Sequence, residues 1–228
     1  MTTWWPYARL AAAVLIIAAV IGQLQLTLSN AMSAETEWGR HLPTVGANFL
    51  SFFTIQSNVL AAVVLAIAGV WALRQKDAVR VEPRWLATLL ACAATYMIVT
   101  GIVYNLLLRN VQLPQGATLP WSNEVLHLVA PLFLLADVLF APRPRSLPWS
   151  TVVVAAVYPI AWVVYTLARS EFIIAPATGE HWWFPYPFLN WHEIGFGIAA
   201  YIVGIAAAII GIACFVVWVR RRRSIRSA

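Results

Sequence analysis

Charged side chains are scarce in this 228-residue chain, at 11%, whereas hydrophobic residues make up 61%. A water-soluble domain carries about a quarter charged residues, so this composition excludes one. The chain instead has six apolar stretches, each near the roughly 20 residues that cross a bilayer as a helix. They cover residues 8–29, 49–73, 85–108, 122–141, 149–168 and 194–219. The sequence therefore predicts an all-α, polytopic membrane protein, a six-transmembrane-helix bundle forming one integral membrane domain over residues 1–228.

Lysine, cysteine and intramembrane histidine are also rare. Lys76 is the only lysine and falls in a predicted loop, which excludes a retinal Schiff base within the membrane. Cys92 and Cys214 form no CxxC motif, and membrane cysteines of this kind are usually packing residues. Only His127 lies well inside a span, which disfavours a haem carrier because that class needs paired axial ligands. We predict no cofactor and no metal.

Basic residues gather in alternate loops and in the C-terminal tail. They are Arg74, Lys76, Arg80, Arg84, Arg143, Arg145, Arg220, Arg221, Arg222, Arg223 and Arg226. Because cytoplasmic loops retain Lys and Arg, we predict that both termini are cytoplasmic. The net charge of +6 then reflects an anchor at an anionic leaflet and not a nucleic-acid patch. The predicted partner is the lipid bilayer of a plasma or bacterial inner membrane, with no nucleic acid and with the oligomeric state left open.

Polar side chains lie toward the outer ends of several spans. They are Thr54, Ser57, Asn58, Asn105, Glu124, His127 and His192. Groups that ionise or hydrogen-bond are costly in a lipid interior, so a shared depth indicates a site. If the second and fourth spans begin near Phe49 and Ser122, Thr54 and His127 both lie roughly 8 Å below the outer boundary.

This cluster contains the parts of a nucleophilic hydrolase. A neutral imidazole at His127 would take the proton of the Thr54 hydroxyl during attack on an acyl carbon. Ser57 and Asn58 share a helix face with Thr54, and either could donate to a developing oxyanion. Glu124 shares a face with His127 and would support it. The sequence thus predicts Thr54 and His127 as catalytic residues.

Structural and transport roles compete with this interpretation. A membrane threonine often bonds back to its own helix, and Asn58 and Asn105 are typical interhelical glue. Glu124 and His192 lie close enough to the interface to be solvated. Alternatively, a set of ionisable groups would bind a small ligand or conduct protons. That set is Glu124, His127, His192 and Glu193.

Three further features bear on the bundle. Pro131 and Pro159 each remove a helical donor, which frees the carbonyl of His127 and of Ala155 and predicts kinks. Asp137, near the cytoplasmic end of its span, is expected to meet Arg143 or Arg145. The proline-rich aromatic segment 182–188 is expected either to cover the outer helix ends as a lid or to lie in the interface as an ordinary loop.

Two motifs of the chain resemble hallmarks of one family. They are Phe52–Asn58, which reads FFTIQSN, and Glu124–Pro131, which reads EVLHLVAP; Tyr186–Asn190, which reads YPFLN, is similar to a third. The family is the androgen-induced / androgen-dependent membrane proteins with their bacterial six-helix relatives, and the chain looks like the bacterial branch. The resemblance implies an intramembrane threonine hydrolase of fatty acid esters of hydroxy fatty acids. By motif position, it implies Thr54 as the nucleophile and His127 as its partner.

Overall fold

The computed structural model describes residues 4–75, 81–111 and 118–226, and none of these residues lies in a β-strand. Six helical segments within them are long and apolar enough to cross a membrane, which makes the chain a multi-pass membrane protein. They are α1 (Trp5–Met32), α4 (Phe53–Arg74), α5 with the π-helix η1 (Arg84–Val103 and Tyr104–Leu108), α6 with the π-helix η2 and α7 (Pro120–Glu124, Val125–Val129 and Ala130–Phe140), α8 (Ser150–Ser170), and α10 (Ile198–Arg226). Lys76 and Arg80 of the predicted basic loop lie outside the described residues.

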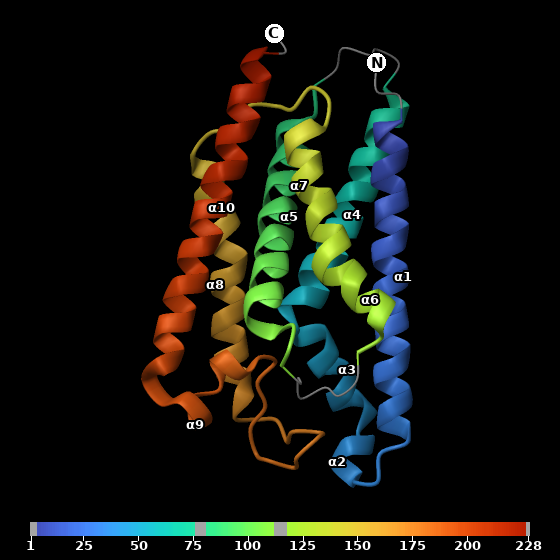
Figure 1. Ribbon diagram of the computed structural model, residues 1–228, viewed down its shortest axis with the longest axis vertical. Coiled ribbons are helices and arrows are strands. Elements are labelled where there is room, and N and C mark those ends of the chain that lie inside the picture. The colour runs from blue at the N-terminus through green and yellow to red at the C-terminus, as the bar shows by residue number, and fades with distance from the viewer. Residues whose placement is uncertain (1–3, 76–80, 112–117, 227–228) are drawn as a thin grey trace.

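The long helices run side by side along one axis, and α1 begins at the end of the bundle where α10 finishes, called the N/C end below (Figure 1). The opposite end is called the loop end. It carries α2 (Glu37–Arg40), α3 (Leu42–Ser51), η3 (Pro187–Leu189), α9 (Trp191–Ile194) and η4 (Gly195–Gly197). An even number of crossings puts both chain ends on one side of a membrane. That this side is cytoplasmic stays a prediction.

The helices differ in how much of their apolar surface faces inward. Buried side chains of α4 and α5 form much of the hydrophobic core. The helices α8 and α10 instead leave many valines and isoleucines exposed, including Val153, Val157, Ile160, Val203 and Ile210. In a bilayer these side chains contact lipid, since burial of apolar surface by acyl chains replaces burial by protein.

The second predicted span is wrong in its start. Residues 49–73 were expected to form one helix, but the chain breaks at Phe52, which has φ −65° and ψ 127° between α3 and α4. The local composition stays apolar across the break, and no glycine or proline marks it. Thr54 is therefore the second residue of α4 and lies in its first turn, not five residues inside a continuous helix.

The freed carbonyl at Pro159 finds a donor on a neighbouring helix. The Tyr96 hydroxyl in α5 donates to the Ala155 carbonyl oxygen at 2.9 Å. Since Pro159 cannot supply a helical N–H to that oxygen, the tyrosine replaces the missing hydrogen bond. This bond ties α5 to α8 in the interior of the bundle.

The predicted partner of Asp137 is also wrong. Its carboxylate accepts from the Arg9 guanidinium at 2.7 and 3.0 Å and from the Trp5 indole N–H at 2.7 Å. Packing of α1 beside α7 brings Arg9 to this carboxylate from far away in the sequence. Arg145 instead donates to the main-chain carbonyl of Glu82.

A second carboxylate extends this ion pair into a network across the N/C end. Glu82 accepts from Arg9 at 3.0 Å and from Arg220 of α10 at 2.5 Å. These side chains and Asp137 belong to residues that are only 2–5% exposed. Two arginines and two carboxylates thus neutralise one another where α1, α7, α10 and the approach to α5 meet.

We expect Asp137→Asn to lower the free energy of unfolding by about 3–5 kcal/mol, because one positive charge then stays buried without compensation. Thermal unfolding of the purified chain in detergent measures this. The control is Glu35→Gln at an exposed carboxylate, which should change stability by less than about 0.5 kcal/mol. Equal melting temperatures for the two variants would contradict the role of the network.

Candidate functional site

The structure brings the Thr54 and His127 side chains together. Thr54 Oγ1 lies 3.3 Å from His127 Nε2, and Thr54 is 8% exposed. On the other side of the ring, Nδ1 lies 3.0 Å from the main-chain oxygen of Asn123. A carbonyl oxygen only accepts, so Nδ1 carries the proton, and Nε2 of the neutral ring is free to accept one. The Thr54 hydroxyl therefore donates to His127, as required for a nucleophile and its base.

An aromatic ring holds the imidazole in place. Tyr104, the first residue of η1, stacks on His127 with ring centroids 3.7 Å apart and planes inclined by 19°. The Tyr104 hydroxyl accepts from Asn123 Nδ2 at 2.5 Å. Asn123 thus orients His127 through its carbonyl and orients the stacking tyrosine through its amide. Such orienting partners fix the tautomer and direction of a catalytic histidine.

His127 lies in the π-helical turn η2, which ends two residues before Pro131. In η2 the Ala130 N–H bonds to the Val125 carbonyl, five residues back, and Pro131 has no N–H to offer. The carbonyls of Leu126 and His127 therefore lack helical donors. Single π-turns of this kind occur frequently at functional sites.

Two asparagine amides supply the missing donors. Asn58 Nδ2 donates to the Leu126 oxygen at 3.2 Å, and Asn105 Nδ2 donates to the His127 oxygen at 3.2 Å. Asn58 also bonds to the Thr54 carbonyl at 2.9 Å, so one amide joins the turn that carries the hydroxyl to the turn that carries the imidazole. These hydrogen bonds agree with the alternative in which the two asparagines hold neighbouring helices together. They also make both amides positioning groups for the pair.

A glycine permits the close approach of α5 to this turn. A Cβ at Gly101 would lie 2.8 Å from the Pro131 Cβ and 3.3 Å from the His127 oxygen. Both distances are shorter than normal van der Waals contacts. Gly101 therefore lets α5 pack directly against the π-turn, which brings Asn105, one turn further along, within reach of the His127 carbonyl.

Tyr186 is a member of the site that the sequence analysis placed in an aromatic segment and in the YPFLN motif, but did not predict as a site residue. Its hydroxyl oxygen accepts from the Thr54 main-chain N–H at 3.2 Å and lies 3.3 Å from Thr54 Oγ1. Because the Thr54 hydroxyl donates to His127, the Tyr186 hydroxyl donates to Thr54 Oγ1. Burial raises the pKa of Tyr186, so the phenol keeps its proton near neutral pH.

The segment 182–188 folds into the bundle and does not lie flat beside it. Trp183, Phe184 and Tyr186 are buried. The Tyr186 ring packs edge-on against Phe52 at 5.5 Å and stacks with Phe188 at 5.1 Å. These contacts favour the interpretation of a cover over the loop end. The sequence signal that could have identified Tyr186 is a phenol hydroxyl among buried aromatic and proline residues.

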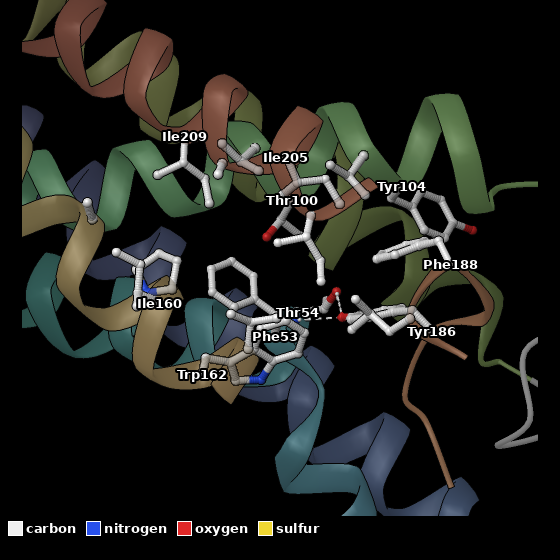
Figure 2. Close-up of a pocket in the computed structure, with 18 of the residues that line it drawn as sticks. Phe53, Thr54, Thr100, Tyr104, Ile160, Trp162, Tyr186, Phe188, Ile205 and Ile209 are labelled. Carbon is white, nitrogen blue, oxygen red and sulfur yellow. Dashed lines mark hydrogen bonds between the residues drawn. The ribbon is translucent and has the colours of Figure 1, made fainter. Parts of the chain in front are cut away.

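Thr54 lies between two cavities. An apolar cavity of about 170 Å³ is enclosed by α4, α5, α8, α10 and η3, and Figure 2 shows the Thr54 and Tyr186 hydroxyl groups together at its edge. Ile160 and Ile210 line it and are also exposed, so its wall reaches the surface between α8 and α10. A second cavity of about 50 Å³, the histidine-side cavity, is lined by both Thr54 and His127.

The remaining predicted residues serve other contacts. The Ser57 hydroxyl donates to the Thr54 carbonyl at 3.1 Å, so Ser57, like Asn58, is used by the main chain. Glu124 forms an ion pair with Arg109 at 2.8 Å. His192 lies outside both cavities that Thr54 lines. It pairs with Glu171 at 2.9 Å and stacks on Trp182 with centroids 4.1 Å apart.

The ionisable groups of the transport hypothesis therefore have separate local partners. Glu193 accepts from Asn190 at 2.8 Å, in addition to the pairs of Glu124 and His192. Within residues 4–75, 81–111 and 118–226, no group of three His, Cys, Asp or Glu side chains is arranged to hold a metal ion. Comparison with protein-family models, curated proteins and solved structures finds no match to this chain.

We expect Asn58→Leu to destabilise the chain by about 1–3 kcal/mol, because the Leu126 carbonyl loses its donor, whereas the Thr54 carbonyl keeps that of Ser57. Thermal unfolding in detergent measures the change. Gln75→Leu is the control, since the Gln75 amide bonds only to the Trp71 carbonyl of its own helix and should cost less than about 0.5 kcal/mol. A loss for Asn58→Leu no larger than that of the control would contradict the bridging role.

Proposed function

We propose that this chain is a membrane-embedded hydrolase of lipid esters in which Thr54 is the nucleophile and His127 the general base. The observation that carries the proposal is the directed hydrogen bond from the Thr54 hydroxyl to the unprotonated Nε2 of His127. The resemblance of FTIQSN and EVLHLVAP to the threonine hydrolase motifs supports the same two residues. The ester class that it suggests is a fatty acyl ester.

The geometry supports a two-step reaction. Thr54 Oγ1 attacks the acyl carbon while its proton passes to His127 Nε2. The tetrahedral intermediate collapses, and the leaving alcohol takes that proton from His127. A water then gives its proton to His127 and attacks the acyl-threonine. The carboxylic acid leaves, and the proton returns from His127 to Thr54 Oγ1.

Two donors beside Thr54 suit the developing oxyanion. The Thr54 main-chain N–H belongs to the first turn of α4, where N–H groups lack helical acceptors and carry partial positive charge. In the free site it bonds to the Tyr186 oxygen. We assign this N–H and the Tyr186 hydroxyl to the oxyanion, in place of Ser57 and Asn58, whose donors bond to main-chain carbonyls.

The apolar cavity suits an acyl chain. Apart from the Thr54 and Thr100 hydroxyls and the polar groups of Tyr104, Trp162 and Tyr186, its lining is aliphatic or aromatic. Along α10 it extends from Ile202 to Ile210, which corresponds to about 12 Å of helix. Since its wall reaches the surface between α8 and α10, an ester could enter sideways from the bilayer.

We expect the purified chain to react with a fluorophosphonate probe at Thr54. Thr54→Val keeps the shape of the side chain but removes the nucleophile, and His127→Gln removes the base. Each should lower the labelling rate by at least about 100-fold. Gel fluorescence and peptide mass spectrometry measure rate and position.

Thr95→Val is the matched control, because the Thr95 hydroxyl is buried but bonds only to the Ala91 carbonyl of its own helix. It should label like the unsubstituted chain. Labelling of Thr54→Val at the unsubstituted rate would exclude Thr54 as the nucleophile.

We expect Tyr186→Phe to reduce kcat toward a p-nitrophenyl ester by about 100- to 1,000-fold, because one oxyanion donor is lost. The ring contacts with Phe52 and Phe188 remain, so KM and the melting temperature should change little. Stopped-flow and steady-state assays in detergent measure kcat and KM separately. An unchanged kcat would remove Tyr186 from the oxyanion site.

A further inference from the structure

A third cavity at the loop end lies next to the site. This loop cavity has a volume of about 180 Å³ and is lined by α1, α3 and the 171–190 connection. It shares Thr27, Phe49 and Phe52 with the histidine-side cavity, so the two are adjacent. Thr54 and His127 line the far side of the histidine-side cavity.

Both cavities are large enough for water. A cavity needs a volume of at least roughly 10–15 Å³ to hold a water molecule, provided polar partners are present. The loop cavity has Thr27, Asn30 and Asn48 in its wall, and the histidine-side cavity has Gln23, Thr27 and Asn123 besides the catalytic pair. The apolar cavity, which Thr54 also lines, has no asparagine or glutamine among its described lining residues.

One buried amide in the loop cavity has an open donor. Asn48 is 5% exposed, and its Oδ1 accepts from Arg169 at 2.7 Å. Its Nδ2 has no hydrogen-bond partner among the described residues. A buried amide N–H without an acceptor is costly, and a water molecule in the adjoining cavity would satisfy it.

We propose that the loop cavity and the histidine-side cavity form the route by which hydrolytic water reaches Thr54 and His127, with Thr27 at their junction. The inference rests on the proposed function. It assigns separate cavities beside Thr54 to the two reactants of deacylation, with the acyl chain in the apolar cavity and water in the route. The water loses its proton to His127 Nε2 and attacks the acyl carbon, and Thr54 Oγ1 leaves with that proton.

The test separates acylation from deacylation. Thr27→Leu fills the junction with apolar bulk without touching Thr54, His127 or the apolar cavity. With p-nitrophenyl octanoate, nitrophenolate release in the first turnover should stay near the unsubstituted rate. Deacylation should slow at least about tenfold, and intact mass spectrometry should detect an octanoyl adduct that accumulates on Thr54.

Ser29→Leu is the matched control, since Ser29 is an exposed hydroxyl residue on the same helix and lines neither cavity. It should deacylate like the unsubstituted chain. Thr27→Val, which keeps the side-chain shape and removes only the hydroxyl, gives a smaller slowing and serves if the leucine variant does not fold.

The outcomes distinguish the two proposals. Deacylation at the unsubstituted rate in folded Thr27→Leu overturns the route, as does an equal loss of acylation and deacylation. If the leucine variant does not fold, an unslowed Thr27→Val overturns it. Hydrolysis that persists in Thr54→Val instead overturns the threonine hydrolase itself.

Discussion

The architecture of the site depends on one constraint: a main-chain carbonyl inside an apolar bundle must find a donor. Pro131 withdraws a donor from the fourth span, and the helix responds with a π-turn that leaves the Leu126 and His127 carbonyls open. Asn58 and Asn105 fill these positions from two other helices. The hydrogen bonds that satisfy these carbonyls thereby help to set the distance between the helices that carry Thr54 and His127.

Buried polar groups are compensated differently at the two ends of the bundle. At the N/C end, Arg9, Glu82, Asp137 and Arg220 compensate one another as full charges. Around Thr54 the groups are neutral: its hydroxyl and main-chain N–H form hydrogen bonds of 3.2–3.3 Å, and its carbonyl accepts at 2.9 and 3.1 Å. The charged network stabilises one end of the bundle, whereas the reaction proposed for the other end requires the hydrogen-bond partners of Thr54 to exchange.

The sequence predicts the long-range architecture better than the local breaks. Apolar length alone identifies the six crossings. A shared depth is compatible with contact between Thr54 and His127 but does not predict it, and the depth of Thr54 was counted from a helix start that is wrong. The sequence analysis does not predict the helix break at Phe52, because a hydropathy pattern does not change at a single residue with an extended backbone. The Asp137–Arg9 pair and the Tyr186–Thr54 contact join residues more than 120 positions apart, and nothing local in the chain specifies such pairs. The carbonyls freed by Pro131 and Pro159 are different, because a proline in the sequence shows directly that a helical donor is missing.

Tyr186 precedes the last crossing, whereas its partner Thr54 begins the second. During synthesis the ribosome adds Thr54 and His127 long before it adds Tyr186. A nascent chain halted after α7 would contain Thr54 and His127, the proposed nucleophile and base, but not Tyr186, the proposed oxyanion donor, or the α8–α10 wall. Under the proposed function, the complete site therefore forms only when the final hairpin docks, and the growing polypeptide does not hydrolyse the lipid around it before then.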